Sequence, residues 1–444
     1  MTTMALLQNK NILVLGLGAT GLSCARFLTK QNVNFVVNDS REKPPGIARL
    51  KQLNSNVQLI SGRWDTEAIA NADLIIASPG VDINLPEIVN NRKVGSELIG
   101  DVELFCQLSN SKVIAVTGSN GKSTVVSLLA HLANYCELNT ALAGNIGLPV
   151  LDVVDEDNDF VILELSSFQL ETMTSMQAVA ATILNISDDH LDRHLTLENY
   201  AKIKHKIFTQ SDRRVVNREQ ELSQPAPVEP TDVSFGLSQP DDGHFGINNV
   251  SGIRYLCFGE TNLVACNQLP IVGKHNELNC LAALALGYCA GWPLAQMVQG
   301  LASFEGLDHR CKQVDSGDDI IWVNDSKATN IGATLAAIDG LASNRHKLIL
   351  IAGGDGKGAD FNELKPALAH VDYLVTFGKD GPQIAALKAN SIEVTNLIDA
   401  VNTSRKLANA GDMVLLSPAC ASIDMFNNYM QRGDMFIQAI REAS

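Results

Sequence analysis

The sequence predicts an α/β protein of three domains, each built around a mainly parallel sheet. Its 444 residues are more than one hydrophobic core usually organises. Short apolar runs alternate with helix-length segments in three successive series, and glycine-rich turns follow several of the runs. We place the domains at residues 1–97, 98–308 and 309–444.

The first series predicts a doubly wound, Rossmann-like sheet, with strands at residues 12–16, 33–38, 57–60 and 74–78. The first strand leads into Gly16-Leu17-Gly18-Ala19-Thr20-Gly21, and Asp39 ends the second. This pattern is typical of a dinucleotide site, in which the acid binds a ribose hydroxyl, but any nucleoside diphosphate fits the same geometry. We expect the turn Ser78-Pro79-Gly80 to lie at the same edge of the sheet.

The second series carries the strongest motif. Residues 115–124 read Ala-Val-Thr-Gly-Ser-Asn-Gly-Lys-Ser-Thr after an apolar strand. A bend of this kind directs backbone N–H groups and a helix N-terminus at one point, which suits a triphosphate. Val116 stands where the usual phosphate loop has its first glycine. We expect a nucleoside triphosphate to be bound by Gly118, Ser119, Asn120, Gly121, Lys122, Ser123 and Thr124, and the family resemblance described below implies that it is ATP.

Other polar side chains are expected at this edge of the central sheet. Glu164 ends a buried strand and is suited to Mg²⁺, while His190 lies in a loop after the next strand. Tyr200 and Lys204 stand four residues apart and so share one face of a predicted helix. The rest of the central domain is predicted to hold parallel strands that begin with one at residue 112 and continue at 160–165 and 180–186. Antiparallel strands are predicted between 233 and 271, and a helix at 276–290.

The third series again alternates strands and helices, with strands near residue 320 and at 348–351, 373–377 and 413–416. The net charge of −15 and the lack of clustered lysine and arginine exclude nucleic acid as a partner. No apolar run approaches a membrane span and residues 1–10 do not resemble a secretion signal, so we expect a cytoplasmic protein. The nine cysteines form no Cys-x-x-Cys pair, which argues against zinc clusters and disulfides.

Six motifs together resemble the Mur ligases. They are the phosphate loop, Leu163-Glu164-Leu165-Ser166-Ser167-Phe168-Gln169-Leu170, Asp189-His190-Leu191-Asp192-Arg193, His275-Asn276, Asn324-Asp325-Ser326-Lys327-Ala328-Thr329-Asn330 and Ser417-Pro418-Ala419-Cys420-Ala421-Ser422. The resemblance implies three domains that bind a UDP-muramoyl substrate, ATP and an amino acid in that order. It also implies ATP-dependent addition of D-glutamate to UDP-N-acetylmuramoyl-L-alanine through an acyl phosphate, in peptidoglycan precursor synthesis for the cell wall, cell shape and cell division. We expect a monomer.

The resemblance also assigns roles to single residues. It implies that Lys122, His190, Lys204 and Lys327 are catalytic and that Ser123, Glu164, His190 and Lys204 organise magnesium, with two ions expected and Lys204 carbamylated. Further ATP contacts are implied for Asn279, Arg310 and Asp325, and substrate contacts for Thr20, Asp39, Ser40, Arg41, Gly80, Asn145, Thr329, Lys357, Ser422 and Tyr429. The base that deprotonates the incoming amine is either His190 or the modified Lys204.

Three alternatives stay open from the residues alone. The first glycine loop would also serve an NAD-linked oxidoreductase, although hydride transfer needs no second phosphate loop. A UDP-sugar sensor would bind nucleotide without releasing phosphate. A folate-glutamate ligase shares the proposed chemistry but lacks the N-terminal glycine-rich domain.

Overall fold

The computed structural model describes residues 7–271, 273–341 and 346–442. The chain forms two compact units. One comprises Met1–Ile186, His190–Phe235 and Ala282–Gly300, and the other comprises Ser187–Asp189, Gly236–Leu281 and Leu301–Ser444. Among the described residues, no helix has the length and apolarity needed to cross a membrane.

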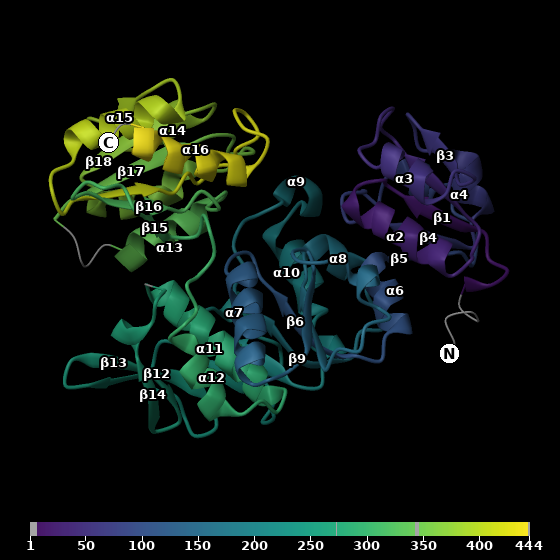
Figure 1. The fold of residues 1–444 in the computed structure, drawn as a ribbon, viewed down its shortest axis with the longest axis horizontal. Helices are drawn as coiled ribbons and strands as arrows, with labels where there is room; N and C mark the ends of the chain where they lie inside the picture. The colour runs from purple at the N-terminus through teal and green to yellow at the C-terminus, as the bar shows by residue number, and fades with distance from the viewer. Residues whose placement is uncertain (1–6, 272, 342–345, 443–444) are drawn as a thin grey trace. The chain divides into compact units, whose positions relative to one another are not determined.

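The first unit begins with a five-stranded parallel sheet in the order β3-β2-β1-β4-β5 (Figure 1). Its strands are β1 (Ile12–Leu15), β2 (Phe35–Asp39), β3 (Gln58–Ser61), β4 (Leu74–Ala77) and β5 (Glu97–Gly100), and its helices are α2 (Ala19–Lys30), α3 (Ile47–Leu53), α4 (Thr66–Asn71) and α5 (Pro86–Val89). The four predicted strands are confirmed to within two residues at each end. We did not predict β5, because only Leu98 and Ile99 interrupt its polar surroundings.

The same unit contains six parallel strands in the order β11-β10-β9-β6-β8-β7. They are β6 (Lys112–Thr117), β7 (Thr140–Gly144), β8 (Phe160–Glu164), β9 (Ala178–Ile183), β10 (Arg214–Asn217) and β11 (Val233–Phe235). The strands β6 and β8 are buried along nearly their whole length, as central parallel strands are. We expected an antiparallel stretch to begin at β11, but this strand pairs in parallel with β10.

Helices follow the strands of this sheet and place side chains at its carboxyl edge. They are α6 (Asp101–Leu108), α7 (Lys122–Tyr135), α8 (Ser167–Glu171), α9 (Leu191–His194), α10 (Leu197–His205) and α12 (Leu294–Leu301), with 3₁₀ turns at Val150–Asp152, Phe208–Gln210 and Glu221–Ser223. The helix α10 begins at a Thr196 cap, whose hydroxyl accepts from the Asn199 N–H. The predicted helix carrying Tyr200 and Lys204 is therefore confirmed.

The second unit contains the predicted antiparallel meander, formed by β12 (Phe245–Val250), β13 (Ile253–Phe258) and β14 (Thr261–Ala265). A 3₁₀ turn at Cys266–Gln268 and the helix α11 (Lys274–Cys289) follow, and the boundary between the two units falls within α11, after Leu281. The two-residue turn Ser251-Gly252 connects the first two strands, and both of its residues have positive φ, which explains the tight reversal.

The second unit ends in a six-stranded sheet of order β15-β16-β20-β17-β18-β19, in which only β15 is antiparallel to its neighbour (Figure 1). Its strands are β15 (Lys312–Val314), β16 (Ile321–Asn324), β17 (Leu348–Gly353), β18 (Tyr373–Phe377), β19 (Ile392–Glu393) and β20 (Met413–Leu416). Its helices are α13 (Ile331–Leu341), α14 (Gly381–Ala385), α15 (Leu397–Leu407) and α16 (Tyr429–Glu442), with 3₁₀ turns at Phe361–Leu364 and Ala367–His370. Trp322 packs edge-on against Phe436 beneath α16.

Candidate active site

The phosphate loop connects β6 to α7 through two glycines at positive φ. Gly118 has φ +151° and Gly121 has φ +84°. A Cβ atom on Gly118 would lie 3.1 Å from the Cβ of Leu184, so the loop has little room for a side chain there. Gly121 caps α7 without a side chain, which leaves the first-turn N–H groups of α7 open to an anion.

Asn185 holds this loop in place, a role that we did not predict. Its Oδ1 accepts from the Asn120 N–H at 2.8 Å, and its Nδ2 donates to the Asn120 carbonyl at 3.0 Å. Its own carbonyl accepts from the Ser119 N–H at 2.9 Å. Asn185 lies two residues after β9, so its place beyond a buried strand was the available signal.

Two of the predicted lysines converge on the loop. The Lys122 Nζ lies 2.7 Å from the Gly118 carbonyl oxygen, and the Lys204 Nζ lies 3.1 Å from the same oxygen. Lys204 is only 1% exposed and also donates to the Thr117 Oγ1 at 3.2 Å. Its Nζ lies 4.6 Å from the centre of the Tyr200 ring. The structure thus brings both lysines to one carbonyl.

Glu164 ends β8 beside the phosphate strand, where it pairs in register with Val116. Its Oε1 accepts from the Asn145 Nδ2 at 2.7 Å, whereas its buried Oε2 has no hydrogen-bond partner among the described residues. An unused carboxylate oxygen beside a phosphate loop fits a hard cation such as magnesium. In the described chain no group of three or more His, Cys, Asp or Glu side chains could hold a metal ion. A magnesium ion here would therefore need other oxygen ligands, and the Ser123 hydroxyl is one candidate.

A row of rings links His190 to the phosphate loop. His190 has φ +53°, and its ring centre lies 5.0 Å from that of Phe168. Phe168 stacks on His194 at 5.3 Å, and His194 lies 5.3 Å from Tyr200. The Tyr200 hydroxyl then reaches the Ser119 Oγ at 3.2 Å. His194, which we did not predict, also lies 2.9 Å from the Ser167 Oγ through its Nε2.

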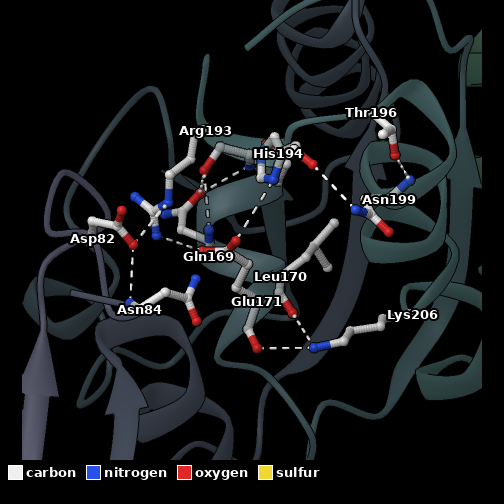
Figure 2. A network of polar contacts seen from close by, with 12 residues as sticks. Asp82, Asn84, Gln169, Leu170, Glu171, Arg193, His194, Thr196, Asn199 and Lys206 are labelled. Carbon is white, nitrogen blue, oxygen red and sulfur yellow. Dashed lines mark hydrogen bonds and ion pairs between the residues drawn. The ribbon is translucent and has the colours of Figure 1, made fainter. Parts of the chain in front are cut away.

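A polar network surrounds Arg193, the residue before His194 of this row of rings (Figure 2). The Arg193 Nη2 donates to the Glu171 Oε2 at 2.9 Å, and its Nε lies 3.2 Å from the Asp82 Oδ1. The latter is an ion pair without hydrogen-bond alignment. Burial raises the pKa of Glu171, with a smaller contribution from Asp82, while Arg193 and Lys206 oppose the rise. Arg193 therefore joins the loop after β4 to α8.

The two small-residue turns of the first sheet lie side by side, as expected. The Ser78 Oγ donates to the Gly16 carbonyl at 3.3 Å. Asp39 is 2% exposed, and its Oδ2 accepts from the Leu17 N–H at 2.7 Å and from the Arg41 Nη2 at 2.7 Å. Burial raises the pKa of Asp39, but these hydrogen bonds outweigh burial and hold the pKa below its usual value. We expected this carboxylate to face a ribose, whereas here it holds the glycine loop and Arg41.

The remaining first-substrate candidates lie at or near the carboxyl edges of their sheets. Thr20 is the second residue of α2, Ser40 follows β2, Gly80 follows the end of β4 and Asn145 follows β7. Of these four residues, Asn145 donates a described hydrogen bond to another candidate residue, Glu164.

The C-terminal sheet presents its candidates at the same kind of edge. The Lys327 Nζ lies 4.2 Å from the centre of the Tyr429 ring, after β16 and at the start of α16 respectively. Thr329 follows in the same loop as Lys327. Lys357 is exposed with φ +53° after β17, and Ser422 is 3% exposed after β20.

Asp325, which we expected to face a ribose, is used inside the domain. Its Oδ2 accepts from the Ser417 hydroxyl at 2.8 Å and its Oδ1 from the Cys311 N–H at 3.2 Å. Burial raises its pKa to about 7. Asn279 is 8% exposed, and its amide donates to the Asn276 Oδ1 at 3.1 Å. Arg310 precedes β15 by two residues and is half-buried.

Comparisons with known proteins show the family to which this chain belongs. Family models described as "Mur ligase MurD-like, N-terminal domain", "Mur ligase middle domain" and "Mur ligase, glutamate ligase domain" match residues 10–100, 116–287 and 309–420. The chain belongs to the Mur ligase family. This confirms the expected family and the expected fold class of three α/β domains.

Relatives of this Mur ligase match it over nearly their full length. A protein of Colwellia psychrerythraea named UDP-N-acetylmuramoylalanine--D-glutamate ligase is 50% identical over 99% of this chain and 98% of its own. A protein of the same name from Shewanella violacea is 47% identical over 97% and 96%. The crystal structure of UDP-N-acetylmuramate-alanine ligase from Thermotoga maritima aligns with a TM-score of 0.62 at 19% identity, covering 98% of this chain and 100% of that chain, and so shows the shared fold.

In this Mur ligase, Arg193→Met is expected to lower the free energy of unfolding by about 3 kcal/mol, because it leaves the carboxylates of Glu171 and Asp82 without their cation. Urea denaturation measures the change. Glu171→Gln added to Arg193→Met is expected to recover part of the loss. The control Arg26→Met breaks a more exposed pair with Asp152, 41% and 28% exposed, and should cost about 1 kcal/mol or less. Equal losses in both single variants would contradict the importance of the network.

A small cavity lies beside the network in this Mur ligase. It has space for about one water molecule, about 10 Å³, and is lined by residues from 77–83, 100–102 and 168–172. Asp101, the first residue of α6, is 4% exposed there, and its Oδ1 has no hydrogen-bond partner among the described residues. Burial raises the pKa of Asp101 to about 6, outweighing the hydrogen bonds from its own N–H and from that of Val102.

The raised pKa of Asp101 predicts a pH-dependent stability. A folded-state pKa of about 6 against 3.8 means that ionisation costs stability as the pH rises through this range, by at most about 3 kcal/mol. Asp101→Asn should therefore gain stability relative to the parent between pH 4 and pH 6 and no more above pH 7. Thermal unfolding across this pH range measures the difference. The control Asp73→Asn should show a nearly constant difference above pH 5, because hydrogen bonds from Asn11 and Lys93 lower the pKa of Asp73 below 3.8, so its contribution to stability changes only at lower pH. If the stability difference between Asp101→Asn and the parent did not change with pH, the raised pKa of Asp101 would be refuted.

Proposed function

We propose that this Mur ligase uses ATP to join D-glutamate to UDP-N-acetylmuramoyl-L-alanine. The proposal is supported by the names of relatives at 50% and 47% identity, matched over nearly full length. Within the site, the observation that carries it is the convergence of Lys122 and Lys204 on an uncapped phosphate loop beside the unused Glu164 oxygen. Such a site favours phosphoryl transfer over hydride transfer.

The reaction must first activate the alanyl carboxylate of the UDP-muramoyl substrate, because a carboxylate does not react with an amine. The alanyl carboxylate oxygen attacks the γ-phosphorus of ATP, the bond to the β-phosphate oxygen breaks, and ADP leaves with an acyl phosphate formed. The attack brings two anions together, so Lys122 must neutralise the γ-phosphate. Its Nζ now contacts the Gly118 and Ser119 carbonyls, which are weaker partners than phosphate oxygens.

The amine of D-glutamate then attacks the acyl carbon, and phosphate leaves with the former carboxylate oxygen as the amide forms. The amine must lose its proton, and either His190 or a carbamylated Lys204 would accept it. For the amino acid we propose Lys357, Ser422 and Tyr429, with Lys327 and Thr329 at the reacting end. Tyr429 already provides a face against which the Lys327 Nζ lies.

The remaining candidate residues are proposed to bind the two nucleotide substrates, ATP and the UDP-muramoyl substrate. We propose that Asn279 and Arg310 hold the adenine and the phosphates of ATP and that Asp325 faces its ribose. Thr20, Asp39, Ser40, Arg41, Gly80 and Asn145 would serve the UDP-muramoyl substrate. For Asp39 this role is indirect, because its carboxylate orients Arg41. Arg41 is 53% exposed and so is available to an anionic ligand.

Magnesium fits the residues near the loop. Ser123, Glu164, His190 and a carbamylated Lys204 would hold it, and we propose two ions. When bound, magnesium would neutralise phosphate oxygens. Carbamylation joins the Lys204 Nζ to the carbon of CO₂. The ammonium loses two protons in all, one to free the amine and one as the carbamate forms, so a buried cation is replaced by an anion suited to a cation site.

One assay tests the proposal. Release of ADP and phosphate is expected only when ATP, magnesium, UDP-N-acetylmuramoyl-L-alanine and D-glutamate are all present. Full rates with L-glutamate or diaminopimelate in place of D-glutamate would contradict the assignment. A nicotinamide absorbance change without ATP would favour an oxidoreductase, and nucleotide binding without phosphate release would favour a sensor. We also propose a cytoplasmic monomer, which cell fractionation and the mass in solution would test.

A further inference from the structure

A buried arginine lies beneath the proposed amino-acid site. Arg432, in α16, is 0% exposed. Its Nε donates to the Ser326 Oγ at 3.0 Å, its Nη2 to the Ser326 carbonyl at 2.7 Å and its Nη1 to the Cys420 carbonyl at 3.0 Å. The guanidinium thus ties the loop after β16 to the loop after β20.

The charge of Arg432 has no direct ion-pair partner among the described residues, although Asp424 and Asp325 stabilise it from a longer distance. All three of these acceptors are neutral oxygens, and no described carboxylate lies within ion-pair distance of the guanidinium. Asp325, in the same region, has a pKa raised to about 7 by burial, so it carries only part of a charge near neutral pH. Burial lowers the pKa of Arg432 to about 10, yet the side chain stays cationic at neutral pH. A buried cation of this kind favours an anion nearby.

The loops that Arg432 joins carry the proposed amino-acid contacts. Ser326 precedes Lys327, and its hydroxyl donates to the Tyr429 carbonyl at 2.8 Å while accepting from Arg432. Cys420 is two residues before Ser422. The third loop is close as well, because a Cβ atom on Gly354 would lie 3.3 Å from the Arg432 Nη1. Gly354 is three residues before Lys357.

We propose that Arg432 is a positioning and specificity-determining residue for the incoming amino acid. It does not touch the substrate. It fixes the three loops in one arrangement, and its positive charge, which meets only neutral oxygens directly, makes their surface selective for a dicarboxylate over a neutral amino acid of the same shape. This inference rests on the proposed function, because it needs D-glutamate as the second substrate.

The test compares Arg432→Met and Arg432→Lys with the parent enzyme, with D-glutamate and its neutral isostere D-glutamine as substrates. In Arg432→Met we expect the KM for D-glutamate to rise about tenfold or more and the preference for D-glutamate over D-glutamine to fall about tenfold. The KM values for ATP and the UDP substrate should stay within about twofold. Arg432→Lys keeps the charge but not the three-way geometry, so it should restore most of the preference while the KM for D-glutamate stays raised.

Arg405 provides the matched control. It is a half-buried arginine of the same domain, but it is paired with Asp318 at 2.8 Å and donates to the Ile440 carbonyl at 2.6 Å, under α16 and away from these loops. Arg405→Met should lower thermal stability without changing the preference. An unchanged preference in Arg432→Met, or equal rises in the KM for ATP and D-glutamate, would overturn the inference.

The outcomes separate the inference from the function on which it rests. If Arg432→Met does not fold, Arg432→Lys decides, because an unchanged KM for D-glutamate in that variant would overturn the role. If the parent enzyme releases ADP without any dependence on D-glutamate, the proposed function fails and the inference fails with it. A D-glutamate-dependent parent with an unaffected Arg432→Met overturns the inference alone.

Discussion

Replacing Lys122 with methionine is expected to lower kcat/KM for ATP by about 10³-fold while leaving the fold intact. The lysine is the cation of the phosphate loop, and its Nζ lies 2.7 Å and 3.0 Å from two loop carbonyl oxygens that a phosphate would replace. Removing it leaves the γ-phosphate charge opposing the attack of the substrate carboxylate. Initial rates of ADP release at varied ATP concentration measure the loss.

Lys112 supplies the matched control for Lys122. It lies at the exposed start of the same strand, β6, with its Nζ 5.4 Å from the centre of the Phe160 ring. Lys112→Met should keep kcat/KM within about twofold, because it is far along the strand from the loop. Lys122→Arg should stay impaired, since a planar guanidinium does not reproduce a compact ammonium inside a tight loop. A loss of less than tenfold in Lys122→Met would show that the charge of this lysine is dispensable.

Much of the fold could be predicted because its central strands are apolar on both faces. The runs ending at Thr117, Glu164 and Ile183 are buried, and a parallel sheet brings their carboxyl ends to one edge. The phosphate loop and Glu164 therefore follow from the sequence. The short strands β15 and β19 do not, because edge strands of two or three residues have too few side chains to show a period.

Side-chain roles set by distant partners were harder to predict. Arg432 lies in an amphipathic helix, where an arginine usually marks the solvated face, and only the tertiary fold shows that loop carbonyls surround it. Asp39 and Asp325 follow strands as ligand-binding acids do, but nearby N–H and hydroxyl donors turn their carboxylates inward. Asn185 bridges the phosphate loop through hydrogen bonds to residues 65 positions away or more.

Lys204→Ala is expected to lower kcat by about 10²-fold or more and to regain part of the activity when formate or acetate is added. The side chain is 1% exposed and lies against the phosphate loop, so the variant leaves a cavity that a small carboxylic acid can fill. If the working form of Lys204 is a carbamate, an added carboxylate supplies the missing anion beside Glu164. A working ammonium would instead be rescued by small amines, because it acts as a cation and a donor.

Lys202 gives the control on the same helix. It is exposed, two residues before Lys204, and Lys202→Ala should keep full activity with no response to formate. Lys204→Ala should also keep its thermal transition within a few degrees, since Tyr200 remains tied to Ser119. Rescue by methylamine but not by formate, in a folded variant, would refute carbamylation while preserving the need for Lys204. Full activity without any rescue agent would remove Lys204 from the catalytic site, because a charged side chain buried against the phosphate loop cannot be lost without effect if it takes part in the reaction.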